Sequence, residues 1–394
     1  MGSAFAADVH LDKVYFGMET YYYPTQGTPP QNHGSAAFTS QFELQGALGE
    51  HWSSRVTPFA RVDTNDSHRS IFDLREAELD YADGPWRFAA GARRLSWSVT
   101  ESVNIVPHQV VDIVNQRDLA GDPAGQEKLG AAMAMASYQA ENTLVQAYLL
   151  PWFRPRRFAS VAAREHPFRG AIDLNDDIRY VSGAEQHRLG GAVRLEQSID
   201  SANLALIQYR GYAPQPIVEP NFSTGKAMQL YYLIDMSALT LQATYGKWLL
   251  KTETAYFNTH SNPEVFTEIP GSYWATVSGV EYTFLRVLGD SDLGVIAEWM
   301  HDSRGDALNG SQFQNDVFVG LRWVPNDQAD SQLLGGVASD LDQRATIFQL
   351  QYQRRIGKQI EIEAVGRAFS AEAANALRAL EDDSVVLLRL RYFF

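Results

Sequence analysis

Segments in which apolar and polar side chains alternate recur along the whole chain of 394 residues. The segment "VVLLRLRYFF" at residues 385–394 shows the pattern, because Leu388 and Leu390 fall on one face of a pleated strand while Arg389 and Arg391 fall on the other. In a soluble sandwich the apolar face would turn to a core. In a membrane barrel it would turn to lipid, and the arginines would face a wet lumen.

This pattern predicts about eighteen strands. Their length of roughly ten residues fits a tilted strand that crosses a bilayer. The predicted strands are 10–23, 36–49, 52–64, 69–82, 86–97, 129–139, 142–151, 188–198, 201–211, 226–243, 247–258, 272–284, 291–301, 312–325, 330–340, 344–356, 358–370 and 383–394.

The connections between these strands alternate in length. Turn residues mark short connections at 49–51, 82–85, 141–142, 200–201, 246–247, 325–327 and 356–358. The long connections are 24–35, 98–128, 152–187, 212–225, 259–271, 302–311 and 371–382. An up-and-down membrane barrel has short turns at one end and long loops at the other, and a β-sandwich or a propeller gives no reason for this alternation. We therefore predict an all-β fold, a transmembrane antiparallel up-and-down β-barrel of about 18 strands, with 16–18 as the expected range.

Residues 9–394 are expected to form this barrel as a single domain. Residues 1–8 are set apart, because Ala4 and Ala6 have the A-x-A spacing found at the end of a secretory signal. We interpret this segment as the end of such a signal, preceded by three residues, Met1, Gly2 and Ser3, that were added as a start.

Composition excludes several classes of protein. No apolar run approaches the roughly 20 residues that a spanning helix needs, and the mean hydropathy is −0.26, which excludes a helical membrane protein. The absence of cysteine removes disulfides and thiolate sites, and the net charge of −14 argues against a nucleic-acid partner. Of the 33 basic residues only six are lysine. The arginines fit either a lumen that binds anionic groups or a compositional bias of the lineage.

The last residue of the chain is an aromatic one, Phe394, and Tyr392, Leu390 and Leu388 share its face. This ending resembles the C-terminal signature of Gram-negative outer-membrane proteins. The resemblance implies a location in the bacterial outer membrane, contact with outer-membrane lipid and lipopolysaccharide, and recognition of Phe394 by the barrel-assembly machinery.

A second resemblance covers residues 72–119. The stretch "FDLREAELDYADGPWRFAAGARRLSWSV", followed by "VDIVNQRDL", looks like a strand, turn, strand and loop of large outer-membrane porins of the alginate-export or substrate-specific type. In such proteins a Trp-Gly pair commonly follows the second strand, whereas here Ser98 follows Trp97. The resemblance implies a channel of about eighteen strands.

Acidic and basic residues face each other on neighbouring predicted strands. Glu76, Glu78 and Asp80 share one face of strand 69–82, and Arg87 and Arg93 lie on the next strand. Opposed rows of charge across a pore discriminate among charged or polyhydroxyl solutes, although the same groups could simply pair with one another. Further candidates for the wall of the pore are Arg61, Arg322, Arg367, Arg389 and Arg391.

Two long loops are candidates for a constriction. Loop 98–128 carries the apolar stretch "VNIVPHQVVDIV", so we expect it to fold into the lumen with polar contacts from Asp112, Asn115, Arg117 and Asp118. Loop 152–187 is rich in arginine and could form a constriction, recruit an anionic solute or contact lipopolysaccharide phosphates. Its arginines are Arg154, Arg156, Arg157, Arg164 and Arg169.

The sequence contains only weak matches to motifs of catalysis or of metal binding. Asp173, Asn175 and Asp177 have the spacing of the first three calcium-loop ligands, but the glycine and the distal glutamate are missing, which favours a solvated acidic loop. Ser291 lies in a short turn and not in a G-x-S-x-G elbow. We expect no enzyme, no cofactor and no metal.

The function predicted from the sequence is an outer-membrane porin for passive diffusion of hydrophilic, anionic solutes or acidic saccharides. The alternative is a barrel component of an envelope export or structural complex. In the first case Arg389→Ala should mainly alter selectivity, whereas a charged residue at Leu388 should impair assembly.

Overall fold

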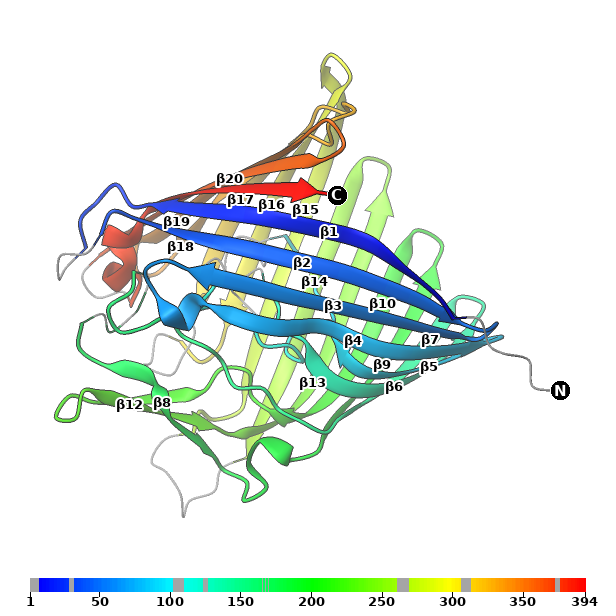
Figure 1. The fold of residues 1–394 in the computed structure, drawn as a ribbon, viewed down its shortest axis with the longest axis horizontal. Coiled ribbons are helices and arrows are strands. Elements are labelled where there is room, and N and C mark those ends of the chain that lie inside the picture. The colour runs from blue at the N-terminus through cyan, green and yellow to red at the C-terminus, as the bar shows by residue number, and fades with distance from the viewer. Residues whose placement is uncertain are drawn as a thin grey trace.

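The computed structural model describes residues 7–27, 32–101, 110–122, 127–164, 166, 168, 170–260, 269–305, 313–372 and 376–394. Eighteen strands form one closed antiparallel barrel (Figure 1). They are β1 (Ala7–Tyr22), β2 (Gly34–Leu48), β3 (Trp52–Asp63), β4 (Ile71–Asp83), β5 (Trp86–Arg93), β6 (Ala131–Ala140), β7 (Thr143–Leu150), β9 (Gly190–Ile199), β10 (Ala202–Tyr212), β13 (Leu233–Tyr245), β14 (Trp248–His260), β15 (Tyr273–Leu288), β16 (Ser291–Asp302), β17 (Asn315–Val324), β18 (Gln332–Asp340), β19 (Ala345–Ile356), β20 (Ile360–Ala371) and β21 (Val385–Phe393).

Each of these strands pairs with the barrel strands before and after it in the chain, and the last pairs with the first. Strands β21 and β1 are in register from Val386 opposite Tyr22 to Phe393 opposite Tyr15. The sheet therefore has no free edge, which removes the unpaired backbone groups that an open sheet would expose. The predicted all-β barrel and its strand number are confirmed.

The short turns lie at one end of the barrel, which we call the turn end, and the long connections lie at the other, the loop end. Figure 1 shows the turns along the rim from the top to the right of the view and the long connections at the left and below. The loop end also carries a three-stranded sheet made of β8 (Asp173–Tyr180), β11 (Ile217–Asn221) and β12 (Lys226–Tyr231). The prediction of one strand over 226–243 was wrong, because Tyr232 separates β12 from barrel strand β13.

The outer wall of the barrel is apolar. In β21, Leu388 and Leu390 are about half exposed, whereas Leu387 and Arg389, which alternate with them, are buried toward the lumen. Aromatic side chains pair near the turn end, for example Trp248 with Tyr282 at a centroid distance of 4.6 Å. Exposed apolar side chains in such a belt are unfavourable in water and favourable in lipid, so the wall is that of a membrane barrel.

Strand β4 contains an irregularity that matters for the lumen. The register with β3 shifts between Thr57 and Pro58, because the ladder skips Arg75 and continues at Glu76. Pro58 cannot donate a backbone hydrogen bond, and a bulge opposite a proline removes the need for one. Arg75 and Glu76 consequently both turn toward the lumen, where each forms an ion pair.

The helical content of the described residues is limited to 3-10 turns, namely η1 (Ser67–Arg69), η3 (Glu185–His187) and η4 (Ala376–Asp383). None of the helices in this part of the chain has the length and apolar character needed to cross a membrane.

Candidate functional site: a charged luminal chamber

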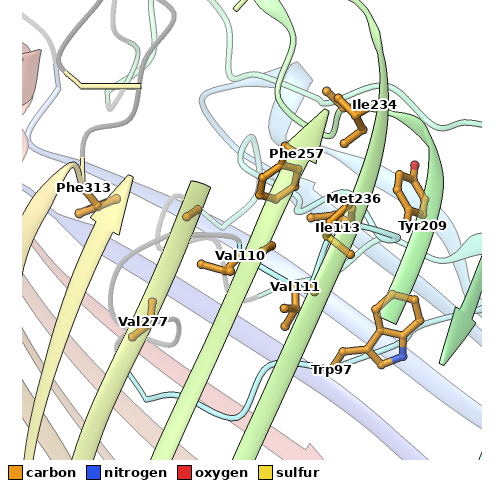
Figure 2. Close-up of a cluster of buried hydrophobic side chains, with 14 of the residues drawn as sticks. Trp97, Val110, Val111, Ile113, Tyr209, Ile234, Met236, Phe257, Val277 and Phe313 are labelled. Atoms are coloured by element: carbon orange, nitrogen blue, oxygen red, sulfur yellow. The ribbon is translucent and has the colours of Figure 1, made fainter. Parts of the chain in front are cut away.

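The connection between β5 and β6, residues 94–130, enters the lumen, and we call it the inserted loop. Its apolar side chains Trp97, Val110, Val111 and Ile113 are buried in one cluster with inward-facing residues of β10, β13, β14 and β15 (Figure 2). Those wall residues include Tyr209, Ile234, Met236, Phe257 and Val277. The inserted loop and this side of the wall therefore share one hydrophobic core inside the barrel. The remainder of the expected apolar stretch, residues 103–109, lies outside the described residues.

Two polar residues of the inserted loop join its two limbs. Asp112 accepts hydrogen bonds from the backbone N–H of Ser98 at 3.1 Å and from Lys128 Nζ at 2.6 Å. Asn115 accepts from the N–H of Leu95 at 2.7 Å and donates to the backbone oxygen of Leu129 at 3.1 Å. These bonds replace the pairing that a hairpin would supply, so the loop has a defined shape without being a strand pair. Burial lowers the pKa of Lys128, although Asp112 opposes the shift.

Carboxylates of the wall hold the loop at residues 98–101. Glu253 on β14 accepts from Ser98 Oγ at 3.2 Å, from the N–H of Val99 at 3.2 Å and from Thr100 Oγ1 at 3.0 Å. Glu298 on β16 accepts from the N–H of Glu101 at 2.8 Å. Buried carboxylates that accept several hydrogen bonds fix the position of the donors, so this contact anchors the loop to the β14–β16 side.

Glu101 itself forms the second part of this anchor. Its carboxylate lies 3.1 Å from Lys251 Nζ and 2.6 Å from a guanidinium nitrogen of Arg322. Both cations also pair with Glu281, at 3.5 and 3.1 Å. Burial acts to raise the pKa of Glu101, but Lys251 and Arg322 outweigh it and the pKa is lowered. Arg322, a predicted pore residue, is thus one member of a four-residue anchor.

The other limb of the loop is tied to the opposite side of the barrel. Asp118 lies 3.0 Å from Arg61 on β3, and Asp122 lies 3.5 Å from Arg389 on β21. Glu127 pairs with Arg75 on β4. Burial acts to raise the pKa of Glu127, but the surrounding arginines outweigh it and lower the pKa to about 2. Because both limbs are anchored, the inserted loop spans the lumen from β14–β17 to β1, β3, β4 and β21.

A cavity of about 670 Å³ remains between the inserted loop and the wall of β4 and β19–β21, and we call it the luminal chamber. Its described lining has six basic and six acidic residues. The basic ones are Arg75, Arg94, Arg117, Lys128, Arg389 and Arg391. The acidic ones are Glu76, Glu101, Asp112, Asp122, Glu127 and Glu363. Gln353 and Arg391 lie near the last residues of β19 and β21, so the chamber reaches toward the turn end.

The predicted rows of charge are present as ion pairs. Arg93 lies 3.0 Å from Glu78, Arg87 lies 2.6 Å from Asp80, and Glu76 lies 3.6 Å from Arg94. Of these five predicted residues, only Glu76 is among the described residues that line the chamber. The others face the lumen beside it, and a second cavity of about 520 Å³ contacts Arg87 and Arg93.

Of the remaining predicted wall residues, Arg61, Arg367 and Arg389 are buried and Arg391 is partly exposed. Arg61 lies 3.4 Å from Glu19, and its side chain is 1% exposed. Arg389 lies 3.3 Å from Glu19 and 3.1 Å from Glu363, while Arg391 lies 2.5 Å from Glu361. Arg367 is buried with its guanidinium 5.1 Å from the centre of the Phe369 ring. The pairing of these groups leaves little net charge on the wall.

The connection between β7 and β9, residues 151–189, covers part of the loop end, and we call it the cap loop. Arg154 lies 2.9 Å from Asp73, and Arg164 lies 2.8 Å from Asp383. Arg157 lies 3.3 Å from Asp118 and donates to the backbone oxygen of His68 at 2.6 Å. These arginines connect the cap loop to other segments of the chain.

Two more arginines were expected in the cap loop. Arg156 donates its backbone N–H to Tyr231 Oη at 2.7 Å, and burial lowers the pKa of its side chain. Arg169 lies outside the described residues.

Sequence reasoning missed several residues of the chamber, among them Arg75, Arg94, Glu101 and Lys128. Arg75 was missed because the bulge shifts it from the outer to the inner face, and Pro58 in the neighbouring strand was the available signal. The others lie in the inserted loop, which is not a strand, so alternation in the sequence cannot predict whether their side chains face the lumen. Among the described residues no group of three or more His, Asp or Glu could hold a metal ion.

No protein-family model and no curated protein matches this chain. Solved structures do match over nearly its whole length. Wzi from Escherichia coli, an outer-membrane protein of group 1 capsule assembly described as a carbohydrate-binding β-barrel, has a TM-score of 0.53 and 10% identity over 95% of this chain and 83% of its own. This chain has the fold of a bacterial outer-membrane β-barrel.

Two further outer-membrane barrels are similar at lower scores. OccD3 from Pseudomonas aeruginosa has a TM-score of 0.49 and 11% identity, with 97% of this chain and 90% of that chain covered. OmpF from Salmonella typhi has a TM-score of 0.48 and 10% identity, with 98% and 97% covered. Outer-membrane barrels place their short turns in the periplasm and their long loops outside the cell. The luminal chamber extends toward the end of this barrel that carries the short turns.

Proposed function

We propose that the protein is an outer-membrane channel through which small hydrophilic solutes diffuse passively, by way of the luminal chamber. The observation that supports this function is a cavity of about 670 Å³ inside the barrel, whose described lining consists mostly of charged, amide and hydroxyl side chains. Apolar solutes would have to remove water from these groups, which is unfavourable, whereas hydrophilic solutes can replace that water with hydrogen bonds.

Arginine content favoured anionic solutes or acidic saccharides, and the chamber gives that preference only limited support. Six acidic residues face six basic ones, so the described lining has no excess of positive charge. We therefore propose a weak preference between anions and cations, with the arginines acting on carboxylate groups locally and not through the net field of the pore.

Planar bilayers containing the purified protein test this function. Stable single-channel openings are expected, with a reversal potential in a potassium chloride gradient that indicates little selectivity. A strong preference for anions would support the anion selectivity expected from the arginine content. A strong preference for cations would contradict both that expectation and the weak selectivity proposed here. Absence of openings over many insertions would contradict the channel itself.

A second candidate function is a barrel component of an envelope export or structural complex. The observation in its favour is the inserted loop, which is anchored on two opposite sides of the lumen by Glu101 and by Asp118. A barrel of the same fold, Wzi, is described as binding carbohydrate. On this proposal the bilayer experiment gives no stable openings, while the folded barrel is retained.

The proposed surroundings are outer-membrane lipid along the belt and lipopolysaccharide at the outer rim. Phe394 is 72% exposed, and its ring lies 5.6 Å from that of Phe16 on β1. An exposed terminal aromatic beside the closing strands supports the proposal that the assembly machinery recognises this end of the chain.

A further inference from the structure

The luminal chamber has a lining whose charges are paired within the protein. Lys128 lies 2.6 Å from Asp112, and Arg391 lies 3.3 Å from Glu363. A net anion that enters such a chamber gains an arginine but also meets the carboxylate paired with that arginine. A solute that carries both charges avoids this repulsion, because each of its groups can replace one member of a pair.

One pair in the chamber is open to such a replacement. Arg94 and Glu76 lie 3.6 Å apart, which is beyond hydrogen-bond distance, and their side chains are 29% and 18% exposed. The Nε atom of Arg94 is buried and has no hydrogen-bond partner among the residues that the structure describes. By contrast, the side chains of Lys128 and Asp112 are 14% and 4% exposed. Arg94 and Glu76 therefore combine a loose ion pair with unused hydrogen-bonding capacity.

The geometry of a guanidinium determines what would use this capacity best. A carboxylate can accept two parallel hydrogen bonds from the two terminal nitrogens of the partly exposed Arg94 guanidinium, and an ammonium group can donate to Glu76. A solute bound in this way adds one negative and one positive charge, so the net charge of the chamber does not change. No aromatic ring is among the described residues that line the chamber, so the apolar face of a sugar ring finds no platform there.

We propose that the luminal chamber is a binding site for small zwitterionic solutes, which carry a carboxylate and an ammonium group, with Arg94 binding the carboxylate and Glu76 the ammonium. This inference rests on the proposed channel function and names its solute class. Arg94 comes from the inserted loop and Glu76 from β4, so the site exists only while the loop lies against this wall.

Matched small probes test the proposal by calorimetric titration of the whole chain in detergent. The probes are γ-aminobutyrate, butyrate, butylammonium and butyramide, which share a carbon skeleton and differ in charge. We expect γ-aminobutyrate to bind about tenfold more tightly than each of the other three. Equal binding of butyrate or of butyramide would overturn the zwitterion assignment.

Variants assign the two roles. Arg94→Gln and Glu76→Gln are each expected to remove the preference for γ-aminobutyrate, and Arg87→Gln, which alters a lumen arginine outside the described lining, should keep it. Retention of the folded barrel is checked by the shift in gel mobility on heating. An unchanged preference in Arg94→Gln with an intact barrel would contradict the assignment.

Bilayer recordings separate this inference from the function on which it rests. Stable openings that γ-aminobutyrate does not reduce more than butyrate would contradict the inference and leave the channel standing. Selective binding of γ-aminobutyrate without any openings would support the binding site and contradict the channel.

Discussion

Arg389 shows how a charge on the inner face of a strand can be structural. Its side chain is 6% exposed and lies within 3.5 Å of carboxylate oxygens of Glu19, Asp122 and Glu363. These three residues belong to β1, the inserted loop and β20. Alternation in the sequence correctly places Arg389 on the face opposite Leu388, but it carries no information about partners that are far away in the chain.

Removal of Arg389 is therefore expected to destabilise the barrel and not merely to alter selectivity. Arg389→Ala leaves three carboxylates without their shared cation in a confined site, at a cost of about 3–5 kcal/mol. The measurement is the free energy of unfolding in urea in detergent or lipid.

Arg87→Ala is the matched control, because the Arg87 side chain is 48% exposed and its one ion-pair partner among the described residues is Asp80. We expect a cost below about 1 kcal/mol for this control. Equal unfolding free energies for the two variants would show that the network around Arg389 contributes nothing.

A charge on the outer face has a different effect. Leu388 is 51% exposed in the middle of β21, so Leu388→Arg places a charge in the lipid belt and is expected to cost about 2–4 kcal/mol. Tyr245→Arg, at the turn end of β13, should cost about 0–1 kcal/mol, because Tyr245 lies near the interface. The yield of heat-modifiable barrel after refolding into vesicles ranks the two variants, and a reversed rank would mean that this face is not the lipid face.

Among the elements, the inserted loop was partly predictable. The apolar residues in "VNIVPHQVVDIV" imply burial, and Val110, Val111 and Ile113 are buried against the wall. The anchors were not predictable, because Glu101 meets Lys251 and Arg322 only through the closed barrel. The strands β8 and β11 were missed for the same reason, and β12 was merged with β13 in one predicted strand. The segment containing β8 was interpreted as an acidic loop, and its partner β12 lies far along the chain.

The anchor at Glu101 makes docking of the inserted loop depend on pH. The pKa of Glu101 is lowered in the docked loop, so its contribution to docking is present above the ordinary pKa of a glutamate and is lost as the pH falls through the lowered value. Hydrogen exchange of residues 98–101 should stay slow from pH 7 to about 5 and rise only in stronger acid.

Glu101→Gln keeps the size of the side chain and removes its charge, so the variant should exchange rapidly at neutral pH. Loss of protection already between pH 7 and 6 in the unmodified chain would contradict the assigned anchor. Exchange in Glu101→Gln that is as slow as in the unmodified chain would show that Glu253 and Glu298 suffice.

At the scale of the whole molecule, the barrel was accessible from sequence while its interior was not. Strand number and alternation follow from local pattern, because each strand must present one face to lipid. The chamber depends on how the inserted loop and the cap loop fold against the wall, and their contacts join residues without any periodic signal. Arg157 and Asp118, 3.3 Å apart, illustrate such a contact between the two loops.

The inserted loop divides the lumen, so release of both its limbs should change conductance. Glu101→Gln removes the ion pairs with Lys251 and Arg322 and so weakens the anchor on the β14–β17 side, and Glu127→Gln removes the pair with Arg75 on β4. We expect the double variant to show larger single-channel conductance than either single variant, because more of the lumen becomes accessible to ions. Identical conductance in all four proteins would show that the loop does not limit the path.

The network around Glu19 also has a consequence for the order in which the molecule can be built. Glu19 belongs to the first strand, Arg389 to the last, and Asp118 and Asp122 reach the same network from the inserted loop. These charges can neutralise one another only after the two ends of the chain have met, when the entropy of closing the longest possible loop has been lost. Until that step the inserted loop lacks part of its docking surface. The filling of the lumen is thus a late event in folding. Arg389 couples it to closure of the barrel, because it lies in the last strand and pairs with both Glu19 of the first strand and Asp122 of the inserted loop.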